Sequence, residues 1–167
     1  MKTKKIIFFV EDPGSSNFVL DLNSSLKKMR INSSVYASGF SKMYLKNFNQ
    51  PFIDYDLNKQ IIYNCDLLIV GTSENTNSPI KQILKEAKKK KIKTGIIIDA
   101  PNSLNERLKV ISTNTKKIDV DFFFTADKET KKKLSKNFNK RKIINVLNPK
   151  FEWIKKQKIK KIKNKKK

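Results

Sequence analysis

Short apolar runs recur along the chain, and most are followed by a polar turn and then by apolar residues at helical spacing. The first run, over 5–10, leads into Pro13 and Gly14, and a later run over 67–70 leads into Gly71. After the first turn, apolar residues at 18, 19, 22, 26 and 29 share one helix face. Strands that alternate with helices in this way predict a parallel sheet whose ligands bind at the carboxyl ends of the strands.

The same pattern predicts the order of elements. Strands are expected over 5–10, 33–37, 52–55, 67–70, 95–98, 120–125 and 142–146, with a short connecting element over 59–63. Helices are expected from Ser15 or Ser16 onward and over 40–48, 79–91, 103–108 and 128–138. Ser78 is the expected cap of the third helix, with Pro79 at its first position. The prediction is a single Rossmann-like three-layer α/β/α domain over 1–152, with a mostly parallel sheet of about six or seven strands.

Composition excludes several kinds of catalytic site. Cys65 is the only cysteine and histidine is absent, so a Cys-His pair, a Ser-His-Asp triad and the usual zinc site are all excluded. No cofactor and no metal are expected. Residues 1–10 imitate the start of a signal peptide, but Glu11-Asp12-Pro13 interrupts the apolar stretch. With no apolar run of about 20 residues, the sequence predicts a cytoplasmic protein.

The net charge of +23 raises the question of an anionic partner. Arginine occurs only at positions 30, 107 and 141, whereas nucleic-acid recognition favours arginine, so nucleic acid is not the favoured partner. A lysine-coated surface set by codon bias explains much of the charge. The tail over 153–167 is the densest part, and between 155 and 167 only four residues are not lysine. A solvated tail is one interpretation; a basic helix that contacts the anionic inner face of a membrane is the other.

Two glycines and two carboxylates mark the first candidate site. Gly14 and Gly71 are two of only four glycines, and both are expected just past strands, where the backbone turns tightly or approaches a ligand. Neither segment fits a dinucleotide or P-loop fingerprint. Glu11 and Asp12 would repel phosphate, so a hydroxylated or cationic ligand suits this turn better. The alternative is that both acids interact only with the helix dipole.

Asp99 marks the second candidate site. It follows a strand of apolar residues, and Asn102 and Arg107 come shortly after it. A carboxylate at the carboxyl end of a strand is well placed to act as a base or to bind sugar hydroxyls. Its structural alternative is to cap the helix over 103–108. Cys65 precedes a buried strand and is expected to be an inert core residue.

These segments in this order resemble the N-terminal half of GT-B-type glycosyltransferases, in particular members that act in polysaccharide biosynthesis. The resemblance rests on Glu11-Asp12-Pro13-Gly14, on Val70-Gly71-Thr72-Ser73-Glu74, and on Asp99 with Asn102 and Arg107. Two further segments, 119–127 and 144–149, match the later strands of that half, although Leu147 stands where glycine is usual. The similarity covers residues 4–152.

The resemblance implies that the chain binds a sugar acceptor while a companion half, expected on another chain, binds the nucleotide sugar. It implies Asp99 as the catalytic residue. The ligand-binding residues would be Glu11, Asp12, Gly14, Ser15, Ser16, Asn17, Gly71, Thr72, Ser73, Glu74, Asn102 and Arg107. Two alternatives stay open: a binder of anionic surfaces that acts through the lysine tail, and an inactive truncated remnant of a split gene.

Overall fold

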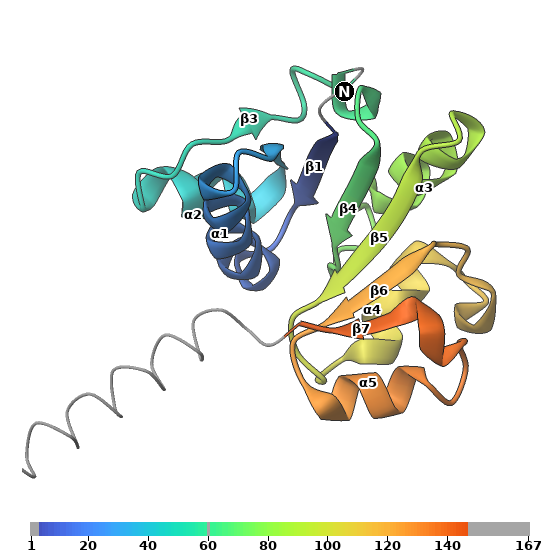
Figure 1. Cartoon of the computed structure of the whole chain (residues 1–167). Helices are drawn as coiled ribbons and strands as arrows, with labels where there is room; N and C mark the ends of the chain where they lie inside the picture. Colours follow the sequence, from blue (N-terminus) through green and yellow to red (C-terminus); the bar gives the residue numbers. More distant parts are fainter. Residues whose placement is uncertain (1–3, 60, 147–167) are drawn as a thin grey trace, which may run out of the picture.

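The computed structural model describes residues 4–59 and 61–146, and its centre is one seven-stranded sheet (Figure 1). The strands lie in the order β3-β2-β1-β4-β5-β6-β7, and every neighbouring pair is parallel. Their bounds are β1 Lys5–Val10, β2 Asn32–Ala37, β3 Ile53–Asp54, β4 Leu67–Gly71, β5 Lys93–Ile98, β6 Phe122–Thr125 and β7 Ile143–Asn145. The Rossmann-like α/β fold predicted from the sequence is confirmed.

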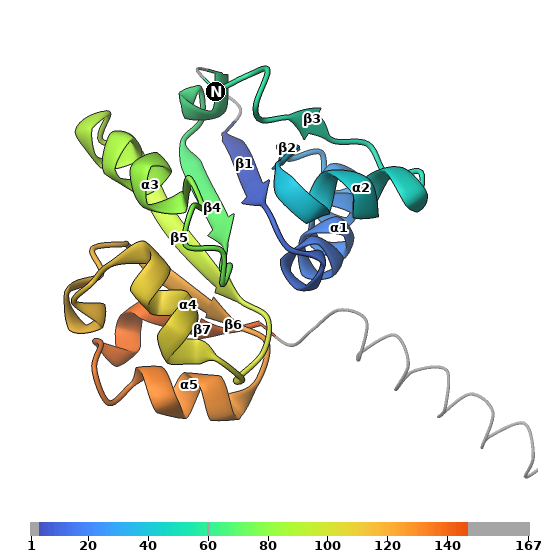
Figure 2. The ribbon, with the colours of Figure 1, turned by 180° about the vertical axis from the view of Figure 1, so that it is seen from behind.

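Helices cover both faces of the sheet (Figure 2). Their bounds are α1 Pro13–Lys28, α2 Gly39–Asn47, α3 Ile80–Lys89, α4 Leu104–Ile111 and α5 Lys128–Leu134. One apolar cluster joins the sheet to α1 and α2, and the other joins it to α3, α4 and α5. Alternate residues of β1 enter the two clusters: Phe8 and Val10 face α1, and Ile7 and Phe9 face the opposite layer. All four are fully buried, as expected of a central strand covered on both faces.

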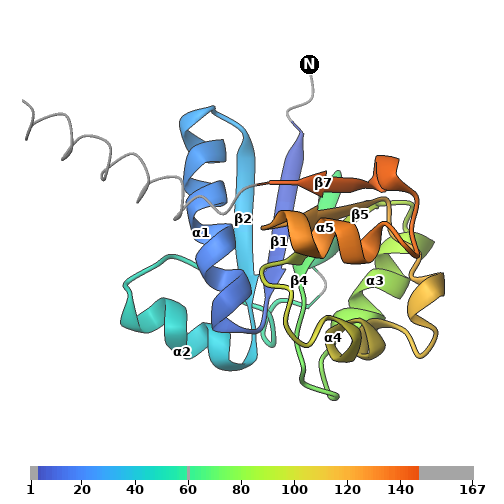
Figure 3. The same ribbon diagram turned by 90° about the horizontal axis from the view of Figure 1, so that it is seen from below.

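The chain reverses its direction across the sheet at β1. It runs from β1 outward through β2 and β3, and then returns to place β4 on the other side of β1. The helices that follow β1 and β4 therefore lie on opposite faces, as the view from below shows (Figure 3). Such a switch point leaves a crevice beyond the carboxyl ends of the two strands, where α/β proteins bind ligands.

The structure corrects four details of the sequence prediction near the helix starts. Gly71 is the last residue of β4 and Gly14 lies inside α1, so neither glycine sits just past a strand. Ser15 and Ser16 are also inside α1, where Asp12 holds the N-cap position. The third helix starts at Ile80 with Pro79 at the N-cap position, one residue later than predicted.

The exposure of one apolar residue also differs from the prediction. Met29, expected on the buried face of the first helix, is exposed. Phe40, Met43 and Phe48, for which the sequence predicted a short helix and no burial, are exposed as well. The last described helix ends at Leu134 rather than at residue 138. The predicted domain end at 152 and the lysine tail lie outside the described residues. Within the described ranges, no helix is long and apolar enough to cross a membrane.

Candidate functional site

The start of α1 packs unusually close to the two neighbouring strands. A Cβ atom on Gly71 would lie 2.4 Å from the Cβ atom of Ser15, and a Cβ atom on Gly14 would lie 2.0 Å from the Oδ2 atom of Asp99. Both distances are too short for two atoms that are not bonded to each other. The two glycines therefore let the helix approach the carboxyl ends of β4 and β5, which brings Asp12 and Asp99 into one site.

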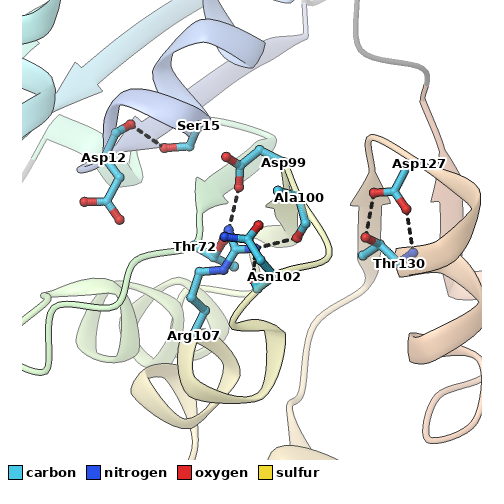
Figure 4. Close-up of polar contacts among 9 residues, drawn as sticks. All are labelled: Asp12, Ser15, Thr72, Asp99, Ala100, Asn102, Arg107, Asp127 and Thr130. Carbon is cyan, nitrogen blue, oxygen red and sulfur yellow. Dashed lines mark hydrogen bonds and ion pairs between the residues drawn. The ribbon is translucent and has the colours of Figure 1, made fainter.

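Arg107 is the cation of this site (Figure 4). Its side chain comes from α4 and is only 7% exposed, and its Nη1 atom lies 2.6 Å from the Oδ1 atom of Asp99. It also donates hydrogen bonds to Thr72 Oγ1 at 3.1 Å, to the carbonyl of Asn102 at 2.8 Å and to the carbonyl of Ala100. Asp99 is thus held by Arg107 and does not cap α4, whose N-cap residue is Ser103. The ion pair fixes one oxygen of Asp99 and leaves Oδ2 facing Gly14.

The carboxyl group of Asp12 has a raised pKa. Burial, as the largest cause, raises its pKa above the ordinary value, and the negative charges of Asp99 and Glu74 raise it further. A hydrogen bond from Ser73 and the positive charge of Arg107 act in the opposite direction. The backbone carbonyl of Asp12 also accepts hydrogen bonds from the hydroxyls of Ser15 and Ser16. Its carboxylate therefore lies in a negative, partly dehydrated environment.

Glu11 is the deepest acid at the end of β1. Its side chain is 5% exposed, and its Oε1 atom accepts a hydrogen bond of 2.8 Å from Asn75 Nδ2. Among the described residues no group donates to its second oxygen, Oε2. Gly39 packs against it with a positive φ of 53°, and a Cβ atom there would lie 3.1 Å from Glu11 Cγ. Glycine suits position 39 for two reasons: the backbone there is left-handed, and a side chain would crowd Glu11.

A pocket of about 620 Å³ opens beside these acids, over the carboxyl ends of β1, β2 and β4. Its volume is within the range that small-molecule sites usually have. The lining residues are Glu11, Asp12, Gly39, Phe40, Met43, Glu74 and Asn75. Three of them are acids, and no lysine or arginine stands among the described lining residues. Phe40 and Met43 form an apolar wall, with 69% and 60% of their surfaces exposed.

The structure divides the ligand-binding residues predicted from the sequence into two groups. Glu11, Asp12 and Glu74 line the pocket, and Thr72, Ser73, Asn102 and Arg107 belong to the polar network around Asp99 and Asp12. Gly71 packs instead against Ser15, and Gly14 packs against Asp99. Gly14, Ser15, Ser16 and Asn17 belong to α1. Ser15 and Ser16 are fully buried, and Asn17 accepts a hydrogen bond from Tyr44. These α1 residues position the helix in this structure, while the first group faces the crevice.

Sequence reasoning missed four residues of the pocket: Gly39, Phe40, Met43 and Asn75. Asn75 directly follows Glu74 and could have been included with the same turn. Phe40 and Met43 were predicted only to belong to a short helix over 40–48. Gly39 could have been identified from the sequence, because it follows the predicted strand over 33–37, as Gly14 and Gly71 follow theirs.

Across residues 4–59 and 61–146, the site includes neither a metal-ligating cluster nor the cysteine. No cluster of metal-ligating side chains is found in the described part of the chain. Cys65 lies at the opposite, amino edge of the sheet, where it is half-buried and donates a hydrogen bond to the carbonyl of Ile62. Burial raises the pKa of its thiol to about 11, so at neutral pH it is a thiol rather than a reactive thiolate.

Solved structures with a similar fold exist, although no protein-family model and no curated protein sequence matches this chain. A provisionally assigned UDP-N-acetylglucosamine 2-epimerase of Listeria monocytogenes is 14% identical, with a TM-score of 0.61. S. aureus MnaA, in a co-structure with UDP, is 14% identical with a TM-score of 0.59. A further UDP-N-acetylglucosamine 2-epimerase is 18% identical with a TM-score of 0.58.

The similarity covers most of this chain but only part of each of those proteins. It extends over 84%, 84% and 86% of this chain, and over 43%, 42% and 46% of the three others. The chain therefore spans less than half the length of the structures that it matches. At these identities the likeness shows the fold alone, which is Rossmann-like.

Proposed function

We propose that the chain binds the sugar acceptor in a glycosyltransferase-like enzyme of surface-polysaccharide biosynthesis, and that a companion half binds the nucleotide sugar. The observation that carries this proposal is the placement of Asp99, Asp12 and Arg107 around one crevice at the switch point of the sheet. The fold similarity to less than half of each sugar-nucleotide-related protein, one of them bound to UDP, supports it.

In this proposal Asp99 is the catalytic base. Its carboxylate accepts the proton of an acceptor hydroxyl while the hydroxyl oxygen forms a bond to the anomeric carbon of the donor sugar. The bond from that carbon to the nucleoside diphosphate breaks, and its electron pair leaves with the diphosphate. Arg107 fixes the orientation of Asp99 through the contact of 2.6 Å, which is the role that a base needs from its neighbour.

The test is transfer of labelled sugar by the chain together with its companion half. The gene downstream is sequenced, a second Rossmann-like half found there is co-expressed, and the pair is incubated with nucleotide sugars and acceptor extracts from the native cell. Asp99→Asn should abolish turnover at a temperature where circular dichroism shows that the variant is folded, because the amide cannot accept the proton. Its melting temperature should fall as well, since the buried Arg107 loses the charge of its partner.

The matched control is Asp119→Asn, which removes an exposed carboxylate near the opposite edge of the sheet, where Asp119 pairs with Lys88. The control should retain full turnover. Unchanged turnover of Asp99→Asn would remove Asp99 from the mechanism. A pair that transfers no sugar from any donor would overturn the proposed function.

A second candidate function is binding of an anionic membrane surface, and one observation favours it. A cleft of about 510 Å³ at the amino edge of the sheet is lined by five lysines: Lys4, Lys5, Lys90, Lys91 and Lys93. Acidic lipid headgroups would be attracted there and to the predicted basic tail over 155–167. Among the described residues of the cleft, Asp66 is the only acid, and its carboxylate accepts a hydrogen bond from the backbone of Lys5.

Sedimentation with phosphatidylglycerol vesicles tests this second function. Deletion of 155–167, or the triple change Lys90→Gln, Lys91→Gln and Lys93→Gln in the full chain, should each weaken binding and its salt dependence. Binding that survives both changes together, or binding to neutral phosphatidylcholine vesicles at equal strength, would contradict it. Tighter binding to RNA than to the vesicles would instead indicate a nucleic-acid partner.

A further inference from the structure

The charge of the carboxyl-edge pocket is opposite to that of the rest of the chain. The net charge of the chain is +23, yet the pocket is lined by Glu11, Asp12 and Glu74 and by no described lysine or arginine. Asp99 adds a fourth carboxylate close by. A ligand with phosphate groups would meet repulsion here, and a cation would meet attraction that the surrounding surface does not offer.

Arg107 does not reverse this sign. Its guanidinium contacts Asp99, Thr72 and the carbonyls of Ala100 and Asn102, and its positive charge also lowers the pKa of Asp12. This cation pairs directly with Asp99, and the described site has four acidic side chains, so acids still outnumber cations in it.

Glu11 offers a specific acceptor for a cation. A buried carboxylate oxygen without a donor costs free energy, because water no longer solvates it. Oε2 of Glu11 is in this position within the described structure, while Oε1 is held by Asn75. An N–H group from a ligand in the pocket would supply the missing hydrogen bond, and an ammonium would supply it with charge.

Two apolar side chains of the pocket suit the carbon face of a sugar ring. Phe40 and Met43 expose most of their surfaces and line the same space as the acids. Aromatic faces attract cations as well as apolar C–H groups. A pocket of about 620 Å³ can hold one or two sugar rings.

We propose that the ligand of this pocket is an amino sugar whose protonated primary amine is bound by Glu11 and Asp12, with Glu74 at the rim. This rests on the proposed function, since it specifies the class of the acceptor. The ring lies against Phe40 and Met43, and the hydroxyl groups point toward Asp99. A neutral or N-acetylated sugar of the same shape binds more weakly, because it brings no charge to the three acids.

The experiment is a titration of the isotope-labelled full chain, followed by backbone amide shifts in two-dimensional NMR. The sugar probes are glucosamine, glucose and N-acetylglucosamine, and the simple probes are cyclohexylamine and cyclohexanol. Glucosamine should bind at least about tenfold more tightly than the two uncharged sugars, since a hydrogen bond between charged groups is stronger than one between neutral groups. The largest shifts should occur at Glu11, Gly39 and Asn75.

Three variants sharpen the test. Glu11→Gln keeps an oxygen for Asn75 and removes the charge, and Glu74→Gln changes an exposed residue that the fold does not need. Both should weaken the binding of glucosamine by a larger factor than the binding of glucose. Glu129→Gln, on exposed α5 and paired with Lys133, is the control of equal charge change and should bind glucosamine as the unaltered chain does.

The outcomes separate the two proposals. Equal affinity for glucosamine and glucose would overturn the amine site and leave a sugar site in place. Binding of cyclohexylamine over cyclohexanol, with no binding of any sugar, would support the cation site and contradict the sugar acceptor. Shifts that are confined to residues far from the pocket would overturn the assignment of the site.

Discussion

The two edges of the sheet carry opposite charges. At the carboxyl edge lie Glu11, Asp12, Glu74 and Asp99, and at the amino edge lie the lysines of the cleft. Helices in this fold run opposite to the strands. Their N-termini therefore lie at the carboxyl edge beside the acids, and their C-termini lie at the amino edge beside the lysines. Lys27 and Lys28 end α1, and Lys88 and Lys89 end α3.

The comparison shows that charge alone does not identify a site in this chain. At the amino edge the lysines are solvated and make few specific contacts. Lys90 lies over the ring of Tyr63. The nearby Asp121 accepts a hydrogen bond from the backbone of Thr94. At the carboxyl edge Glu11 and Arg107 are buried, and Asp12 and Asp99 are half-buried. Arg107 and Asp99 are held in a network, beside glycines that permit close approach. A buried, organised arrangement of charges is expensive to maintain, which is why it marks a functional region.

The largest expected effect comes from removing the cation of the carboxyl edge. Arg107→Ala leaves Asp99 and two carbonyl groups without their partner, so the free energy of unfolding should fall by about 3 kcal/mol. Urea denaturation measures this. Lys93→Gln at the amino edge is the comparison, and it should change stability by less than about 0.5 kcal/mol. Similar values for the two variants would remove the distinction between the edges.

A smaller effect is expected from filling the contact between α1 and β4. Gly71→Ala places a methyl group against Ser15 and should cost about 1–3 kcal/mol of stability. Ser15→Gly removes both atoms that would clash, so the double variant should be more stable than the sum of the two single changes predicts. Strict additivity of the two changes in urea denaturation would show that this close approach is not what requires glycine at position 71.

The smallest effect on stability is expected at Asp12, and the size of this effect depends on pH. Because burial raises the pKa of Asp12 above 3.8, the folded chain binds this proton more tightly than the unfolded chain. Ionised Asp12 therefore lowers stability above the raised pKa, and the penalty disappears as the pH falls below 3.8. Without ligand, Asp12→Asn should have a slightly higher melting temperature than the unaltered chain near neutral pH.

The difference in melting temperature should shrink as the pH is lowered through the raised pKa of Asp12. Asp119→Asn, with an exposed carboxylate at the other edge, should show no such gain near neutral pH. A melting temperature of Asp12→Asn that is lower than that of the unaltered chain at neutral pH would mean that the ionised carboxylate stabilises α1 as a cap.

The fold follows from local pattern because a parallel strand between two helix layers needs apolar residues on both faces. The runs at β1, β4 and β5 satisfy this without reference to any other part of the chain. The buried face of α3, formed by Ile80, Ile83, Leu84 and Ala87, was likewise predicted from spacing alone. Asp99 could also be singled out, since it directly follows β5. Helix caps were predicted less well: Ser15 and Ser16 lie inside α1, whereas Ser78 does accept a hydrogen bond from the backbone of Ile80, although Pro79 holds the N-cap position.

What the sequence determined by itself is thus the order of strands and helices, and the fact that polar residues follow the strand ends. Only the tertiary structure decided which of those residues meet. Asn75 reaches Glu11 across 64 positions because the crossover brings β4 beside β1, and Arg107 reaches Thr72 across 35 positions because β5 pairs with β4. Exposure of Phe40 and Met43 was decided in the same way. Helical spacing reports a shared face, but whether another layer covers that face depends on segments far away in the chain.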